Sequence, residues 1–197
     1  TQVALLTERL RALGHRVRTL REPGGTPIGE EIRHTLKHSK DNHDMTAEAE
    51  LLLMNASRAQ LVREVIRPAL DAGEIVVCDR FYDSTTAYQG YGRKLDLKMV
   101  QAIIHVAVGD PRPDLTLMLA LSPEVAAERL RSRQSTMAFV RDRIEEADRS
   151  FFERVAKGYE AIAAAEPERV RTIDAGRSLD AVSAAIWQLV QPLVAKR

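Results

Sequence analysis

A short run of apolar residues, Ile75 to Cys78, constrains the fold of this chain more than any other feature. The run is too short for a helix and rich in β-branched side chains, so it predicts a buried strand of a parallel sheet. Asp79 and Arg80 follow the strand directly. Opposite charges at the carboxyl end of such a strand lie where open α/β sheets bind ligands. The run therefore indicates both an α/β fold and the edge at which a site is expected.

The segment after this charge pair, residues 81–93 (FYDSTTAYQGYGR), is dense in hydroxyl, amide and aromatic groups. With Asp79 and Arg80 it offers an acid for a metal, an arginine for a phosphate and polar groups for a planar base. A structural alternative is a strand–helix turn in which the Asp–Arg pair is only a cap. The density of polar groups favours the ligand-binding interpretation, which depends on the structural context for confirmation.

Composition narrows the class of protein. The chain has 197 residues, of which 45% are hydrophobic, so residues 1–197 are expected to form a single domain with a sizeable core. The net charge of +1 gives no support for binding to nucleic acid or to a membrane surface. There is no run of transmembrane length and no visible signal peptide. The single cysteine, Cys78, excludes a disulfide framework and favours a reducing compartment such as the cytoplasm.

Helical and strand patterns alternate along the chain. Strands are expected at residues 15–20, 75–78, 115–120 and 169–173. Helices are expected at residues 1–13, 27–36, 46–72, 96–108 and 122–133, in a later stretch that ends at about residue 165, and at residues 178–194. This alternation is typical of one parallel sheet sandwiched between layers of helices in a single domain.

Two further stretches carry candidate chemistry. Pro23, Gly24 and Gly25 make a rigid turn after the first expected strand, which brings backbone close to a ligand or to another segment. On the helix at 46–72, Met54 and Arg58 share one face. A buried arginine needs a partner, which could be a bound base, a phosphate or an internal carboxylate such as Glu22.

Arginine is concentrated in residues 131–149, at positions 131, 133, 141, 143 and 149. Taken alone, the pattern favours a solvated charged helix or linker. The functional alternative is a mobile lid that places arginines over a polyphosphate, where guanidinium groups stabilise charge during phosphoryl transfer.

Four segments together resemble bacterial thymidylate kinases: Arg21-Glu22-Pro23-Gly24-Gly25-Thr26, Asn55-Ala56-Ser57-Arg58, the stretch from Cys78 to Gly90, and Pro113-Asp114-Leu115-Thr116. Their order and spacing match over essentially the whole chain, and the combination is specific where no single piece would be. The resemblance implies a three-layer P-loop nucleoside monophosphate kinase fold. It also implies transfer of the γ-phosphoryl group of ATP to dTMP with Mg²⁺, giving ADP and dTDP for dTTP biosynthesis, by a homodimer.

Carried over residue by residue, the resemblance implies a site for the acceptor nucleotide. Arg58 would bond the thymine carbonyl, Gln89 would contact the base edge and Thr85 would lie beside it. Tyr88 would lie against the sugar, where a 2′-hydroxyl would be crowded. Met54 occupies the position where the family commonly has a phenylalanine that stacks on thymine; a thioether can also pack on a ring face.

The resemblance also implies a phosphate and donor side. Arg33 and Arg80 would hold the acceptor phosphate, and Glu22 and Asp79 would lie near the sugar, the phosphates and hydrated Mg²⁺, with Asp79 on the metal side. The implied catalytic residues are Asp79, Arg80, Arg141 and Arg143, and the implied ATP-binding residues are Thr1, Arg129, Arg141, Ala175, Gly176 and Arg177.

One departure concerns the donor side directly. The family's phosphate-binding loop lies immediately before the residues that Thr1 and Gln2 match. We therefore expect the first strand and this loop to lie upstream of Thr1, and residues 1–197 alone not to be an efficient kinase. Three alternatives stay open: a kinase of another nucleotide or of a deoxynucleoside, a nucleotide-binding module without catalysis, and a purely structural α/β protein.

Overall fold

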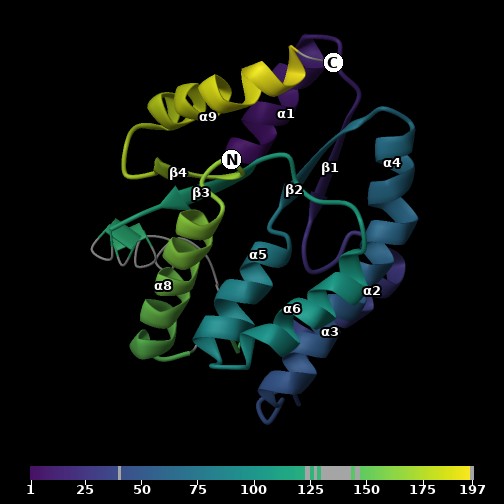
Figure 1. Ribbon diagram of the computed structural model, residues 1–197, viewed down its shortest axis with the longest axis vertical. Helices are drawn as coiled ribbons and strands as arrows, with labels where there is room; N and C mark the ends of the chain where they lie inside the picture. The colour runs from purple at the N-terminus through teal and green to yellow at the C-terminus, as the bar shows by residue number, and fades with distance from the viewer. Residues whose placement is uncertain (40, 123–124, 127, 130–142, 145–146, 196–197) are drawn as a thin grey trace.

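The computed structural model describes residues 1–39, 41–122, 125–126, 128–129, 143–144 and 147–195. Within these ranges the predicted alternation of strands and helices is confirmed (Figure 1). The strands are β1 (Val17–Arg21), β2 (Ile75–Asp79), β3 (Thr116–Ala120) and β4 (Val170–Asp174). The helices are α1 (Gln2–Ala12), α2 (Pro27–Lys37), α3 (Ala47–Leu61), α4 (Arg67–Asp71), α5 (Tyr82–Thr85), α6 (Leu97–Val108), α8 (Arg149–Ala165) and α9 (Leu179–Val194), with π-helical segments η1 (Val62–Ile66) and η2 (Thr86–Gly92).

The strands are parallel and flanked by helices, as predicted, but their pairing differs from one continuous sheet. Among the described residues, β1 pairs with β2 and β3 pairs with β4, which gives two separate two-stranded sheets. β2 and β3 each have one strand neighbour, so the apolar residues of β2 are half-buried rather than fully buried. The physical reason for the difference is that a hydrophobic pattern locates a strand but does not specify its neighbours.

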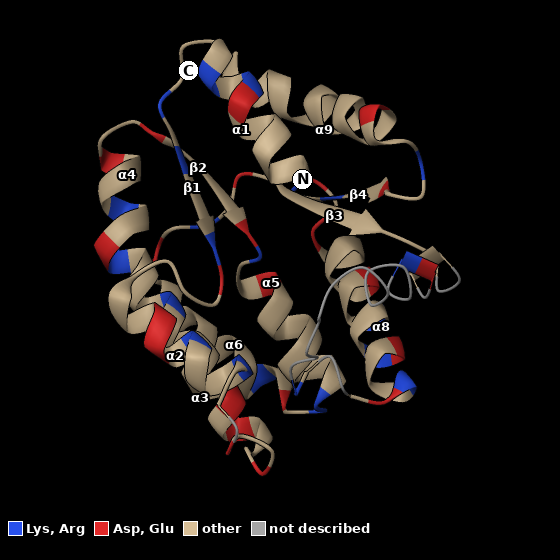
Figure 2. Cartoon of the chain, turned by 180° about the vertical axis from the view of Figure 1, so that it is seen from behind, with Lys and Arg blue, Asp and Glu red and all other residues tan. Residues whose placement is uncertain are grey.

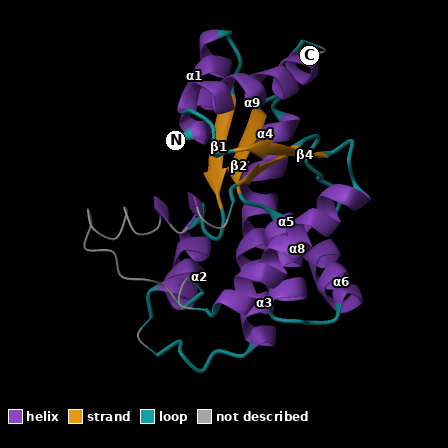
Figure 3. Cartoon of the chain, turned by 90° about the vertical axis from the view of Figure 1, so that its left-hand side faces the viewer, coloured by secondary structure: helices purple, strands orange, loops and turns teal. Residues whose placement is uncertain are grey.

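Helices lie on both sides of the strands (Figures 1 and 3). α1 and α9 pack together on one side, where Leu10, Ile173, Val182, Ile186 and Val190 form a buried cluster. α2, α3, α5, α6 and α8 lie on the other side, which also holds the site. None of the helices in the described part of the chain is long and apolar enough to cross a membrane.

Local sequence signals account for the helix boundaries. Thr46 and Ser178 cap α3 and α9 as predicted, each accepting a hydrogen bond from a backbone N–H of the first turn. The long helix expected over residues 46–72 continues through the π-helical segment η1 into α4. Pro68 stands in the first turn of α4, where a missing N–H is tolerated, so it marks a change of helical geometry rather than the end of the helix.

The register of β1 and β2 brings their carboxyl ends to the same level. Arg21 is opposite Asp79, and the backbone N–H of Glu22 donates to the carbonyl of Asp79 over 3.0 Å. Figure 2 shows acidic and basic residues directly after both arrowheads. The turn that follows β1 and the helical segment that follows β2 therefore meet at one edge.

Candidate functional site

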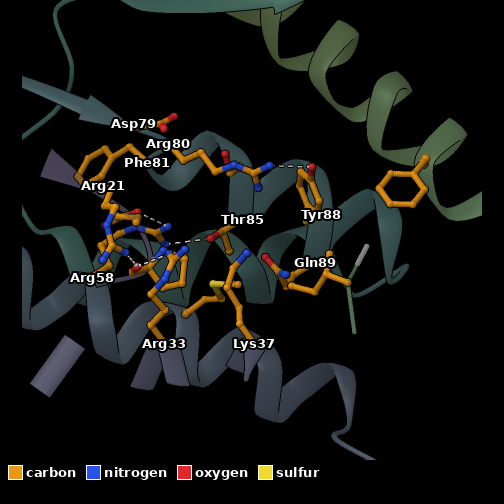
Figure 4. Close-up of a pocket in the computed structure, with 16 residues that line it drawn as sticks. Arg21, Arg33, Lys37, Arg58, Asp79, Arg80, Phe81, Thr85, Tyr88 and Gln89 are labelled. Carbon is orange, nitrogen blue, oxygen red and sulfur yellow. Dashed lines mark hydrogen bonds and ion pairs between the residues drawn. The ribbon is translucent and has the colours of Figure 1, made fainter. Parts of the chain in front are cut away.

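A pocket opens at this edge, between the ends of β1 and β2 and the helices α2, α3, α5 and α8 with η2 (Figure 4). All the residues for which the resemblance implied contact with the acceptor nucleotide line it: Glu22, Arg33, Met54, Arg58, Arg80, Thr85, Tyr88 and Gln89, together with Asp79. Residues that are far apart in the sequence are thus brought into one cavity.

Arg58 and Glu22 form a buried ion pair at the inner wall of the pocket. Nε and Nη2 of Arg58 donate to Oε2 of Glu22 over 2.9 and 2.7 Å, and both side chains are buried. Nη1 of Arg58 donates to Asn55 over 3.0 Å and to Thr85 over 2.9 Å. Of the partners that the sequence left open for Arg58, the structure contains the internal carboxylate.

Each member of this ion pair has one hydrogen-bonding group without a partner among the described residues. Oε1 of Glu22 is buried and accepts no hydrogen bond from the described residues. Burial raises the pKa of the Glu22 carboxyl above its ordinary value, and the adjacent Arg58 guanidinium opposes that rise. One of the five guanidinium N–H groups of Arg58 has no partner among the described residues, since four are used by Glu22, Asn55 and Thr85.

The turn after β1 is held by hydrogen bonds on both sides. The N–H of Gly24 donates to Oγ of Ser57 over 3.0 Å, and that of Gly25 donates to Glu30 over 2.8 Å. Gly24 has φ +123°, a conformation that side-chain-bearing residues rarely adopt. Arg33 donates to the carbonyl of Pro23 over 2.9 Å. The predicted rigid turn is confirmed, and it anchors Arg33 at the rim of the pocket.

Arg80 has an unusual backbone and a defined side-chain partner. Its φ is +68°, in the left-handed region. Its Nη2 donates to the hydroxyl of Tyr88 over 3.1 Å, and its guanidinium carbon lies 4.9 Å from the centre of the Tyr88 ring. Non-glycine residues with positive φ concentrate at functional sites, where the surrounding structure maintains the strain.

Of the two arginines predicted for the lid, only Arg143 lies within the described residues. Arg143 lies against the carboxylate of Glu50, to which its Nη2 donates, and it is not among the residues that line the pocket. Its neighbour Ile144 does line the pocket. Arg141 lies outside the described residues, as does most of the segment 131–149, so the lid stays a prediction.

None of the predicted ATP-side residues that the structure describes is among those that line this pocket. Nη2 of Arg129 donates to the carbonyl of Ala175 over 2.9 Å, so two of them are adjacent in space. The N–H of Gly176 donates to Asp174 over 2.8 Å, and Arg177 is exposed beside it. Thr1 is exposed before α1 and accepts a hydrogen bond from the N–H of Leu5.

The pocket also contains residues to which the sequence assigns no role: Arg21, Lys37, Phe81, Ser84, Ile144 and Phe152. The helix expected at 27–36 stops one residue short of Lys37, which is the last residue of α2. Lys37 follows Arg33 by one helical turn, so the spacing could have indicated a shared face. Phe152 comes from α8, and no local sequence signal connects it with the other lining residues.

The acidic residues suit a hydrated cation shared with a ligand better than a cation enclosed by protein. Among the described residues there is no group of three or more His, Cys, Asp or Glu side chains placed to hold a metal ion. Asp79 is an exposed carboxylate at the pocket, which is enough for Mg²⁺, because this ion keeps several waters and uses one or two carboxylates plus substrate phosphates. Asp79 therefore fits the metal role that the resemblance implies.

Fold and site together define a class of protein. Parallel strands flanked by helices hold, at their carboxyl ends, a pocket with several guanidinium groups beside a buried amide and a buried hydroxyl. Such a pocket suits a ligand with an anionic group and a flat polar ring, so the molecule is an α/β domain of the nucleotide-binding class.

Comparison with known proteins identifies the family. Residues 1–186 match the family model described as thymidylate kinase. A thymidylate kinase of Synechococcus sp. (strain JA-3-3Ab) is 47% identical over 192 residues, which cover 98% of this chain and 89% of the relative. That of Gluconobacter oxydans (strain 621H) is 48% identical over 192 residues, covering 96% and 87%. The crystal structure of thymidylate kinase from Ehrlichia chaffeensis superposes with a TM-score of 0.75 at 30% identity, covering 96% and 89% of the two chains. The chain belongs to the thymidylate kinase family and is an enzyme of that family, which confirms the resemblance.

Proposed function

We propose that this enzyme binds dTMP in the pocket and transfers the γ-phosphoryl group of ATP to it, giving dTDP and ADP. The observation that carries the proposal is that one pocket combines two chemically different groups of side chains. Arg58, Thr85 and Gln89 are buried, whereas Arg33, Lys37 and Arg80 are more exposed and bring positive charge; Figure 4 labels all six. We call the first group the buried end and the second group the charged end, and we place the sugar between them, against Tyr88.

At the buried end, the side chains offer hydrogen bonds complementary to thymine. Arg58 has one N–H left for a ring carbonyl, and Gln89 presents an amide. Met54 lines the same region and supplies a polarisable thioether to the ring face. Because Arg58 and Gln89 are already bonded to neighbours, little ordering is needed when the base enters.

At the charged end, guanidinium groups match the phosphate. Arginine forms paired hydrogen bonds with phosphate oxygens, so Arg33 and Arg80 can hold the acceptor phosphate and neutralise charge as its oxygen attacks the γ-phosphorus of ATP. Phosphoryl transfer depends on alignment and charge stabilisation more than on a protein nucleophile. The fixed anchors, Pro23 for Arg33 and Tyr88 for Arg80, supply that alignment.

The donor side is proposed from fewer contacts. Asp79 would hold a hydrated Mg²⁺, which neutralises charge on the transferring phosphates. Arg129 and Ala175, which are hydrogen-bonded to each other, would lie near adenine together with Gly176 and Arg177. Arg141 and Arg143 would come from the lid segment to the phosphates.

We also propose that the enzyme is a homodimer. Apolar side chains are exposed on three helices of one layer, with Ile28 of α2 at 55%, Leu52 of α3 at 56% and Val106 of α6 at 74%. A second copy would cover such side chains. Sedimentation velocity would give twice the mass of one chain, and Leu52→Glu would shift the equilibrium toward monomer. A monomer at high micromolar concentration would contradict this proposal.

Two measurements test the function. Calorimetry with dTMP, dUMP, CMP and AMP should give the tightest binding for dTMP, and a coupled assay of ADP production by the full-length protein should depend on dTMP, ATP and Mg²⁺. Arg33→Met probes the charged end and Gln89→Leu the buried end, and each is expected to weaken dTMP binding. Equal affinity for all four nucleotides would refute dTMP as substrate. Binding without turnover would favour the nucleotide-binding module.

A further inference from the structure

Glu50 is a buried carboxylate outside the residues that line the pocket. It lies in the first turns of α3, and its side chain is fully buried. Nε2 of Gln89 donates to Oε1 over 2.7 Å. Arg93 donates to both oxygens, over 3.2 Å from Nε and 3.0 Å from Nη2, and Arg143 donates to Oε2. One carboxylate therefore joins α3 to η2 and to a residue of the arginine-rich segment.

These contacts keep Glu50 ionised. Burial alone would raise the pKa of the Glu50 carboxyl, but the hydrogen bonds from Arg93 and Gln89 and the charges of Arg93 and Arg143 bring it below its ordinary value. Two arginines, Arg93 and Arg143, pair with this one carboxylate, so positive charges outnumber the negative charge in the cluster.

An ionised carboxylate accepts hydrogen bonds and donates none. The amide of Gln89 must therefore turn its nitrogen toward Glu50, because the opposite orientation would place a carbonyl oxygen against a carboxylate oxygen. The amide oxygen of Gln89 is then presented to the pocket, where Figure 4 shows it on the side of Thr85. That oxygen is available to a ligand.

We propose that Glu50 is a positioning residue that sets pyrimidine selectivity, by fixing the amide of Gln89 so that it offers an acceptor to the imide N–H of the base. This inference rests on the proposed function, because it assigns the direction of a hydrogen bond to the acceptor nucleotide. Thymine and uracil carry a hydrogen at N3 and can donate to Gln89. Cytosine has an unprotonated N3, so its lone pair would face the amide oxygen and leave both acceptors unsatisfied.

The variant Glu50→Gln tests the proposal, since it keeps the shape of the side chain but can either donate to or accept from Gln89. The ratio of the dissociation constants for dCMP and dTMP, measured by calorimetry, should fall about tenfold or more as the Gln89 amide becomes free to rotate. Arg93→Met is the matched control. It removes an ion pair from the same carboxylate but leaves the bond to Gln89, so it should lower Tm while the selectivity ratio stays within about twofold.

The exchanged pair, Glu50→Gln with Gln89→Glu, provides a second test. There the carboxylate faces the base and accepts only, so selectivity for dTMP should recover over that of the single variant. If Glu50→Gln does not fold, this double variant decides, and loss of selectivity in it overturns the proposal. An unchanged ratio in folded Glu50→Gln, or an equal loss in Arg93→Met, also overturns it. Failure of the unmodified enzyme to bind dTMP would instead refute the proposed function, which separates the two outcomes.

Discussion

The buried ion pair between Arg58 and Glu22 allows a stability prediction whose size follows from geometry. Glu22→Gln keeps the side-chain shape but removes the negative charge that receives both Nε and Nη2 of Arg58. Arg58, only 3% exposed, would then keep Asn55 and Thr85 as partners but no counter-charge. Removing one member of a buried ion pair costs about 3–5 kcal/mol, because the remaining charge stays desolvated.

In a domain of this size, 1 kcal/mol corresponds to about 2–4 °C in Tm, so Glu22→Gln should lower Tm by roughly 6–20 °C. Urea unfolding followed by circular dichroism measures the free energy, and scanning calorimetry measures Tm. The pair of Arg18 and Glu74, at 3.0 Å with side chains 50% and 15% exposed, is more accessible to solvent and supplies the control. Glu74→Gln should cost less than about 1 kcal/mol.

The double variant Glu22→Gln, Arg58→Met separates charge from packing. If the loss in Glu22→Gln comes from an unpaired buried charge, removing that charge should restore part of the stability although one more polar contact is gone. The reasoning is refuted if Glu22→Gln costs no more than Glu74→Gln, or if the double variant is less stable than the single variant.

Three further predictions concern single residues. The folded-state pKa of Glu50 lies below its unfolded value of 4.5. The ionised carboxylate therefore contributes stability above about pH 4.5, and this contribution is lost as pH falls through the folded pKa. Glu50→Gln should flatten the acid side of a plot of Tm against pH. Arg80→Gly should be about 1 kcal/mol more stable than Arg80→Ala in urea, because glycine relieves the positive φ, while both variants lose the contact with Tyr88 and bind dTMP more weakly. Gly24→Ala should cost about 1–3 kcal/mol, mainly from φ +123°, since the nearest obstacle is the end of the Glu30 side chain, which can move; equal stability of Gly24→Ala and the unmodified chain would contradict this.

The features that sequence predicts well are those encoded locally. The strand at Ile75–Asp79, the caps at Thr46 and Ser178, and the helix that presents Met54 and Arg58 on one face follow from periodicity, caps and turn residues. The resemblance then carries roles to positions that the structure collects in one pocket.

The sequence does not predict which side chains or strands pair with one another, because these contacts form between segments that are distant in the sequence. The resemblance places Gln89 at the base edge, but nothing local indicates that Glu50, thirty-nine positions earlier, holds its amide. It places Arg143 near phosphates, and the structure has Arg143 on that same carboxylate. The division of the described strands into two pairs has the same cause, since a strand pattern does not specify its neighbour.

The groups proposed to contact the base are held by two buried carboxylates, whereas the groups proposed to contact the phosphate are less confined. Glu22 holds Arg58 and Glu50 holds Gln89, so the groups proposed to contact the base are fixed before it arrives. Arg80 is exposed and Arg33 half-buried, so the groups proposed for the phosphate are longer-reaching and less confined. A fixed polar group discriminates because a wrong partner leaves it unsatisfied, whereas a movable charge follows the phosphate as it changes geometry during transfer. Substitutions at the buried end should therefore alter which pyrimidine is accepted, and substitutions at the exposed end should alter turnover for every acceptor alike.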